Sequence, residues 1–266
     1  MKRLLIAVSI IISVLVVLGF VGMWAVKKGI SPLVDGAQLQ DGRVTVVVDN
    51  TSPMPVAAYL LKLNNGNLGL IDATMDPEAK AICSAIRRMG RSESEVKVIF
   101  CTHSHDDHTA GCRKFPNATI YAMKPSIQGN SQSSISNWNR IQQAMPGKNQ
   151  DPSQPRRDVQ FLSDGQVLDF NGDKFEAFAL PGHTYDSAAY LVFGILFMGD
   201  SAAGQYNGRI GSAPPFVSVD RNMNQRELKK LAGRLQNRKS EIDYLTFGHQ
   251  GPIKGLDPLL LWASSH

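Results

Sequence analysis

The strongest constraint on the fold is a cluster of histidines and aspartates that directly follows an apolar segment. Residues 95–101 are typical of a buried strand, and a short helix is expected from about Asp107. Three histidines and two aspartates, including His103, His105 and His108, lie within residues 103–108. Packing them together without a cation would be costly, because buried charged groups lose their hydration. The segment therefore predicts a metal site on a loop held between a strand and a helix.

Three further candidate ligands follow other predicted strands. His183 and His249 each come after a glycine at a strand end, and Asp200 follows Gly199 in the same way. Of the six histidines, only the terminal His266 has no such position. Taken alone, Asp200 would suit a strand-end turn, but a carboxylate at this place could also bridge two cations.

The spacing within the loop favours two ions rather than one. His103 and His105 are two residues apart, so they can converge on one ion from an extended backbone. Asp107 and His108 follow at the turn into the helix, where they can face a second ion.

The remaining pattern indicates an α/β sandwich, because strands come first and then alternate with helices in two halves. Helices are expected from Pro77 to Met89, with Asp76 as the N-cap, from Gln225 to Asn237, and after Pro258. A loop rich in Gly and Pro covers 204–216. Strands are expected at 44–48, 57–63, 68–71, 95–101, 118–122, 159–162, 167–170, 175–180, 188–193, 196–198 and 242–247.

The chain is expected to consist of one folded domain with two appendages. Residues 1–28 form an N-terminal tail and anchor, 29–42 a linker, and 43–266 the domain. Residues 124–158 are rich in Ser, Asn, Gln and Pro, with an amphipathic piece at 135–145, and are expected to be an insertion or lid.

The N-terminus carries a long apolar run. Residues 4–26 contain no charge, and about 20 apolar residues span a bilayer. A cleaved signal peptide is the main alternative, but its apolar stretch is about 7–15 residues and ends in an A-x-A site, which is absent around Gly22–Ala25. We therefore expect an uncleaved transmembrane signal-anchor helix, with Trp24 in the interfacial belt.

Orientation and charge lead to two further expectations. Two basic residues flank the apolar run on each side, Lys2 and Arg3 before it and Lys27 and Lys28 after it, so the local charge does not set the orientation. A short basic tail before a long domain resembles a signal-anchor, which would place the domain on the non-cytoplasmic (periplasmic or extracellular) side. Four of the 28 basic residues flank the apolar run, so residues 29–266 hold 24 basic against 23 acidic side chains. Such a near-neutral body gives little steering toward phosphate backbones, and no nucleic-acid partner is expected. The three cysteines, Cys83, Cys101 and Cys112, are expected to be buried, with at least one unpaired.

The H-x-H-x-D-H motif, followed in order by G-H, G-D and G-H at later strand ends, resembles the metallo-β-lactamase-fold superfamily over about residues 43–255. The resemblance implies an αββα four-layer sandwich with a dinuclear metal site where the strands end. It also implies two divalent cations per chain, with Zn²⁺ favoured and Fe or Mn as alternatives. Asp72 matches an acid that supports ligands rather than binding metal. The implied ligands are His103, His105 and His183 for the first ion, Asp107, His108 and His249 for the second, and Asp200 as the bridge.

These features predict a metal-dependent hydrolase. Two cations that share a water lower its pKa, and the resulting bridging hydroxide would attack an ester, lactone, thioester or related bond of a small-molecule substrate. Asp107 is the expected catalytic residue, because it could also orient the attacking oxygen.

The expected substrate class depends on positions where this chain differs from particular branches of the superfamily. Asp200 argues against the antibiotic-hydrolysing members, which usually carry Cys or Ser there, and Ala203 stands where lactonases commonly have Tyr. After the Gly-His-Thr segment that contains His183, Tyr185 and Asp186 stand where the family usually has Pro or Gly. Candidates to bind a glutathione thioester are Arg234, Arg238, Lys239 and Lys254.

Several alternatives remain. They are a β-lactamase or phosphodiesterase of the same fold and, in a different class, a non-catalytic metal-binding membrane protein. An iron redox protein is disfavoured, because it usually carries Glu at the position of His105.

Overall fold

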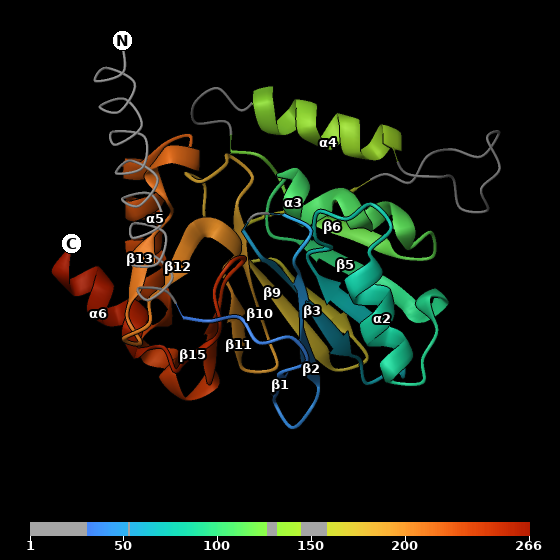
Figure 1. Ribbon diagram of the computed structural model, residues 1–266. Coiled ribbons are helices and arrows are strands. Elements are labelled where there is room, and N and C mark those ends of the chain that lie inside the picture. The colour runs from blue at the N-terminus through green and yellow to red at the C-terminus, as the bar shows by residue number, and fades with distance from the viewer. Residues whose placement is uncertain (1–30, 53, 127–131, 145–158) are drawn as a thin grey trace, which may run out of the picture.

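Two β-sheets stack face to face, and helices cover the outer face of each sheet (Figure 1). The computed structural model describes residues 31–52, 54–126, 132–144 and 159–266. The first sheet has the order β1 (Gln38–Leu39), β2 (Val44–Asp49), β3 (Val56–Lys62), β4 (Leu68–Ile71), β5 (Val96–Cys101), β6 (Thr119–Met123) and β7 (Gln160–Leu162). The second has the order β15 (Ile253–Lys254), β14 (Tyr244–Thr246), β11 (Ile195–Phe197), β10 (Ala188–Val192), β9 (Asp173–Ala179) and β8 (Val167–Phe170).

The helices and short 3₁₀ turns lie outside these sheets or at their edges. The α-helices are α2 (Lys80–Arg88), α3 (Asp106–Thr109), α4 (Gln132–Ala144), α5 (Arg221–Leu235) and α6 (Asp257–Ser265). The 3₁₀ turns are η1 (Glu93–Glu95), η2 (Ala110–Lys114), η3 (Gly199–Ser201), η4 (Pro215–Val217) and η5 (Gln236–Glu241).

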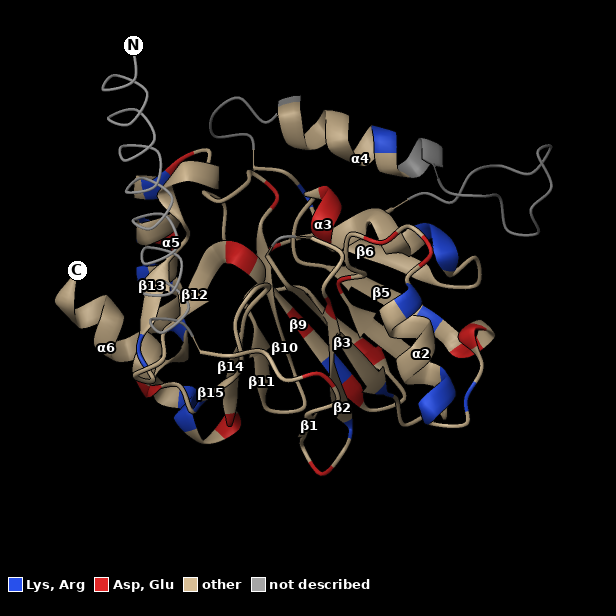
Figure 2. Cartoon of the chain, in the orientation of Figure 1, with Lys and Arg blue, Asp and Glu red and all other residues tan. Residues whose placement is uncertain are grey.

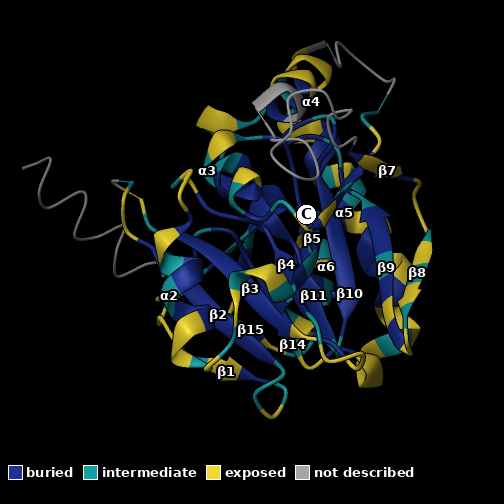
Figure 3. Ribbon diagram, turned by 90° about the vertical axis from the view of Figure 1, so that its right-hand side faces the viewer, coloured by how far each residue is buried: buried dark blue, intermediate teal, exposed yellow. Residues whose placement is uncertain are grey.

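Three separate apolar clusters fill the spaces between the four layers, which confirms the expected αββα arrangement. Strand β3 shows how alternation produces it: Leu60 packs under α2, while Tyr59 and Leu61 face the second sheet. The third cluster joins Leu196 of β11 to Leu228 and Leu231 of α5. The central strands of each sheet are therefore buried on both faces, whereas the edge strands β7 and β8 carry exposed residues, as Figure 3 shows.

Strand direction brings the candidate ligands to one edge. Strands β4, β5 and β6 run parallel, with Ile71 paired to Phe100, so Asp72 and Thr102 leave their strands together. In the second sheet β11 and β14 are parallel, with Phe197 paired to Thr246. The segments that follow β4, β5, β11 and β14 therefore meet at the same end of the sandwich.

Two helices begin at places other than those predicted. The expected start of α2 at Pro77 is wrong, because Ala79 takes a left-handed conformation with φ 45° and the helix begins at Lys80. Asp76 still caps a turn, since its carboxylate accepts hydrogen bonds from the backbone N–H groups of Glu78 and Lys80. Helix α5 begins four residues before the predicted Gln225, with Asp220 as its N-cap.

The segment predicted as a loop at 204–216 contains more structure than expected. Strands β12 (Ala202–Gly204) and β13 (Ile210–Ser212) pair as a separate two-stranded sheet, and η4 follows. Within the expected linker 29–42, β1 joins the first sheet, and Ser31 exchanges backbone hydrogen bonds with Gly204 and Gly251.

The predicted insertion contributes a packed helix. Trp138 and Ile141 of α4 belong to the cluster on the outer face of the first sheet, and Trp138 is 1% exposed. Residues 127–131 and 145–158 of this segment lie outside the described residues, as does the predicted transmembrane segment 4–26. Among the helices of the described ranges, none has the length and apolar character required to span a bilayer. Figure 2 shows basic and acidic residues interspersed over the outer elements.

Candidate metal centre

The first three predicted ligands come together at the end of the strands. His103 and His105 lie on the loop between β5 and α3, and His183 follows β9. The Nδ1 atom of His105 lies 3.1 Å from Nε2 of His103 and 3.1 Å from Nε2 of His183. Three imidazole nitrogens from two separate loops therefore lie close enough together to share one ion.

The second group lies beside the first, and Asp200 touches both. Its Oδ1 is 3.6 Å from His108 Nε2, and its Oδ2 is 3.2 Å from His249 Nε2 and 3.6 Å from His183 Nε2. Asp107 Oδ2 is 3.4 Å from His249 Nε2. All seven predicted residues are thus brought together, in overlapping groups whose donor atoms lie within 4.8 Å of one another.

Hydrogen bonds on the other ring nitrogen orient three of these histidines. His108 Nδ1 donates to Asp72 Oδ2 at 2.8 Å, and His249 Nδ1 donates to the Pro55 carbonyl at 2.8 Å. His183 Nδ1 lies 3.3 Å from Ser218 Oγ, whose own proton goes to the Pro214 carbonyl. Because Nδ1 carries a proton in each case, Nε2 is the ring nitrogen that faces the other ligands and that would bind a cation.

Asp72 supports ligands of both groups. Besides His108, it accepts hydrogen bonds from the Thr102 backbone N–H at 2.7 Å and from Thr102 Oγ1 at 2.8 Å. Thr102 Oγ1 in turn lies 3.1 Å from His103 Nδ1 and accepts its proton. Asp72 is 1% exposed and holds a positive φ of 57°. Asp72 therefore supports the histidines through hydrogen bonds and does not belong to the groups that could bind metal.

The charges of the cluster shift its pKa values in opposite directions. Burial lowers the pKa of His103 well below its usual range, and lowers that of His183 to about 4. Burial also acts to lower the pKa of His249, but the carboxylates of Asp200 and Asp107 outweigh it and raise the value to about 10.

The buried carboxylate of Asp200 follows the opposite pattern. Burial alone would raise its pKa, yet the charges of His108 and His249 hold it well below its usual range. For Asp107 the same balance, with a hydrogen bond from His249, lowers the pKa. Both acids are therefore ionised at neutral pH and can serve as anionic ligands.

The glycines of the motif are required by close packing. A Cβ on Gly182 would lie 2.3 Å from the Asn224 backbone N, and one on Gly199, where φ is +50°, would lie 2.3 Å from Thr102 Oγ1. A Cβ on Gly248 would lie 2.2 Å from Asp200 Oδ1. The glycine beside each ligand therefore lets the neighbouring loops approach closely.

The donor set fits divalent transition metals. His108 Nε2 is fully buried and has no hydrogen-bond partner among the described residues, although it faces carboxylate oxygens. A buried polar atom without a partner is rare unless a ligand satisfies it. Imidazole nitrogens and carboxylate oxygens together suit zinc and also accommodate iron or manganese.

Other predicted residues lie apart from the cluster. The terminal His266 stacks on Trp262 with ring centroids 4.8 Å apart. The three cysteines are free and buried, as expected. The basic candidates for thioester binding are exposed or half-buried: Arg234 pairs with Asp164, Arg238 with Glu176 and Glu241, and Lys239 with Asp257, while Lys254 lies on β15.

The sequence gives no sign of the role of Asp186, which stands there only as a departure from the residues usual in the family. It is fully buried and accepts hydrogen bonds from Ser104 Oγ at 3.1 Å and Trp138 Nε1 at 2.7 Å. Asp186 therefore ties the His183 loop to the metal-binding loop and to α4. The sequence likewise gives no sign that Thr102, Ser218 and the carbonyl of Pro55 support the histidines, because residues of these types occur in many other roles.

The four-layer sandwich and the cluster at its edge define a protein of the metallo-β-lactamase class. The model of the metallo-beta-lactamase superfamily matches residues 51–238, more than half of the chain, and the chain belongs to this superfamily.

Individual relatives are more distant. The chain is 27% identical over 134 residues to the hydroxyacylglutathione hydrolase of Aeromonas hydrophila, an alignment that covers 49% of this chain and 42% of that protein. The matched part thus spans less than half of that relative's length.

Solved structures share the fold. A metallo-beta-lactamase family protein from Thermus thermophilus superposes with a TM-score of 0.58 at 20% identity, covering 84% of this chain and 77% of that one. A flavoprotein from Thermotoga maritima gives a TM-score of 0.58 at 18% identity, covering 88% and 61%.

Proposed function

We propose that the protein is a metallo-hydrolase that uses two divalent cations to cleave an ester, lactone, thioester or related bond. The observation that carries this proposal is the convergence of the Nε2 atoms of His108, His183 and His249 on the carboxylate of Asp200, with His108 Nε2 buried and without a hydrogen-bond partner among the described residues. His103, His105 and His183 would hold the first cation. Asp107, His108 and His249 would hold the second, with Asp200 shared between them.

The bound cations would supply Lewis acidity and lower the pKa of a water molecule toward neutrality. The residues of the chain would orient the ligands and the attacking water and accept its proton. Asp72 fixes the tautomers of His108 and, through Thr102, of His103. Asp107 is ionised, and its side chain is 30% exposed at a cavity, so its carboxylate can orient the attacking water and accept a proton.

The acyl-type substrates are favoured on two grounds. The curated relatives are thioester hydrolases by name, and Asp200 retains the carboxylate that the antibiotic-hydrolysing branch usually replaces. A β-lactamase or phosphodiesterase remains the alternative within the fold. A panel that compares an ester, a lactone, a thioester, a phosphodiester and a β-lactam should show hydrolysis of the first three well above the last. Turnover confined to the β-lactam would contradict the proposal.

Metal content provides the direct test. Purified protein should carry about two transition-metal ions per chain, most of them zinc, when measured by elemental analysis. His103→Ala should empty mainly the first site and His249→Ala mainly the second. Asp200→Ala should weaken both, because a shared carboxylate also screens repulsion between two cations. His266→Ala is the matched control and should leave the metal ratio unchanged. A wild-type protein that is active without metal would overturn the assignment.

We further propose that residues 4–26 anchor the chain in a membrane, with the domain on the non-cytoplasmic side. The support is the uncharged apolar run and the short basic tail before it. A reporter fused after Trp262 should behave as an exported protein, and full-length protein should stay with membranes in a high-salt wash. Cytoplasmic reporter activity would reverse the orientation, and a shortened soluble form would show cleavage.

A further inference from the structure

The candidate metal centre opens into a cavity of about 400 Å³ whose outer part is apolar. The inner end carries His105, Asp107, His183, Asp200 and His249. The rest of the lining, here called the apolar wall, consists of Met54, Ala202, Ala203, Pro214, Phe216 and Val217, with Gln250 as its one polar neighbour. A polar reacting centre therefore lies at the end of a hydrophobic surface, as in sites that bind a substrate with an apolar portion.

From this arrangement we infer that the cavity selects a neutral acyl substrate whose apolar chain lies on Met54, Phe216 and Val217, and that it disfavours an anionic glutathione conjugate. The inference rests on the proposed hydrolase function and specifies its substrate class.

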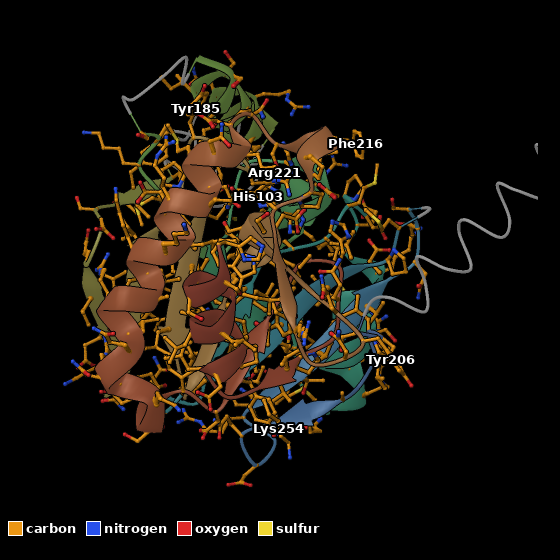
Figure 4. The ribbon with its side chains drawn as sticks, turned by 90° about the vertical axis from the view of Figure 1, so that its left-hand side faces the viewer. His103, Tyr185, Tyr206, Phe216, Arg221 and Lys254 are labelled. Carbon is orange, nitrogen blue, oxygen red and sulfur yellow. The ribbon has the colours of Figure 1, made fainter. Side chains whose placement is uncertain are left out.

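Three large apolar side chains of this wall are exposed to solvent, so a ligand could cover them. Phe216 is 98% exposed, and Val217 and Met54 are each 53% exposed. In Figure 4, Phe216 lies at the outer edge of the molecule, in the same upper half as His103. A large apolar side chain that contacts water over its whole surface gains free energy when a ligand covers it, at about 25 cal/mol per Å² of buried apolar area.

The loop that carries Phe216 is fixed to the metal-binding residues. The Val219 backbone N–H donates to the His183 carbonyl at 3.0 Å, and the Asp220 N–H donates to the Gly182 carbonyl at 2.9 Å. Ser218 accepts from His183 Nδ1 while its hydroxyl donates to Pro214. The segment that carries Phe216 and Val217 is thereby held in a fixed position relative to His183. A surface that selects substrates requires such a fixed position.

The charges around the cavity disfavour an anionic leaving group. Among the described residues that line it, the ionisable ones are Asp107, Asp200 and three histidines, and none is Lys or Arg. Arg209 and Arg221 line a different cavity with Trp262. The two carboxylates of a glutathione conjugate lie away from the thioester carbonyl that the cations would bind. They would lose hydration against Phe216 and Val217 without a Lys or Arg side chain to pair with.

The test compares thioesters that differ in one property at a time. N-acetylcysteamine thioesters are neutral, whereas the corresponding S-acylglutathiones have the same thioester bond but carry two carboxylates and an ammonium group on the leaving thiol. For the neutral series, kcat/KM should rise about threefold for each methylene from butanoyl to octanoyl. At equal chain length, the neutral thioester should be hydrolysed at least about tenfold more efficiently than the glutathione thioester.

The Phe216→Ala variant should lower kcat/KM for the octanoyl thioester at least about fivefold more than for the acetyl thioester. Tyr206→Ala is the matched control, because Tyr206 is also an exposed aromatic residue, 72% exposed, but does not line this cavity. It should retain the wild-type chain-length profile.

A binding measurement separates this inference from the proposed function. The hydrolysis-inert S-octyl thioether of N-acetylcysteamine should bind the purified protein in calorimetry with a negative heat-capacity change, and Phe216→Ala should weaken that binding about fivefold. Equal binding of the S-octyl and S-ethyl thioethers, or preference for S-acylglutathione, would overturn the inference even if hydrolysis is observed. Absence of hydrolysis with octyl binding intact would instead overturn the proposed function alone.

Discussion

Gly248 shows how a single residue controls the geometry of the candidate metal centre. A methyl group there would lie 2.2 Å from Asp200 Oδ1 and 2.5 Å from His108 Cε1. Gly248→Ala should therefore push two candidate ligands apart, lower metal content below that of the wild type and reduce hydrolysis at least about tenfold. Overpacking of this kind destabilises a folded protein by about 1–3 kcal/mol. Elemental analysis and thermal unfolding measure both effects.

Gly233 provides the control for that substitution. It lies on the exposed face of α5, and no atom within 4 Å would contact an added Cβ. Gly233→Ala should leave metal content unchanged and stabilise the protein by about 0.5–1 kcal/mol, because alanine favours a helix over glycine. Equal metal loss in both glycine variants would contradict the role assigned to Gly248.

For individual residues, the sequence predicts the candidate metal ligands better than the residues that hydrogen-bond to those ligands. His183, Asp200 and His249 could be found because each follows a glycine at a strand end, a pattern that combines chemistry with backbone geometry. Thr102 and Ser218 could not, since a hydroxyl that accepts one proton from a histidine resembles any other hydroxyl in the sequence. Their role depends on contacts that only the folded chain creates.

Helix α4 depends on one buried contact rather than on its surface ion pair. Trp138 Nε1 donates to the buried carboxylate of Asp186, whereas Arg140 pairs with Asp106 at the surface. Trp138→Phe should destabilise the protein by about 1–3 kcal/mol, because one carboxylate oxygen of Asp186 loses its partner. Arg140→Ala should cost less than about 1 kcal/mol, as exposed ion pairs contribute little. Denaturant unfolding compares the two, and an equal loss would contradict this account.

The errors in element boundaries have specific physical causes. Asp76, Pro77 and Glu78 have the composition of a helix start, but the left-handed Ala79 separates their capped turn from α2. Strands β12 and β13 are three residues each, and their Ala, Gly and Ser content shows no alternation. By contrast, β3 and β10 carry continuous apolar character through the buried sheets, and the sequence predicts them to within one residue at each end.

For the molecule as a whole, metal removal should give a protein that is most stable near neutral pH. In the metal-free state the pKa of His249 is raised to about 10, so its stabilising contribution is fully present below the unfolded value of 6.5 and is lost as pH rises toward 10. His183 has a pKa lowered to about 4. Below pH 6.5 the unfolded chain therefore binds a proton that the folded chain does not, and stability falls toward pH 4.

Bound cations should remove most of this dependence on the alkaline side, because they take the place of the proton on His249 Nε2. They should also raise stability by about 4 kcal/mol when free metal is a thousandfold above its Kd. Thermal unfolding of chelator-treated protein should show Tm falling from pH 7 to pH 9, while zinc-loaded protein changes less over that range. His249→Gln should reduce the alkaline decline in the metal-free state but leave the part due to His108. Burial acts to lower the pKa of His108, but the carboxylates of Asp200 and Asp72 outweigh it and raise that pKa well above its usual range. His266→Ala should keep the full decline. A metal-free Tm that rises between pH 7 and pH 9 would contradict the charge balance assigned to this cluster.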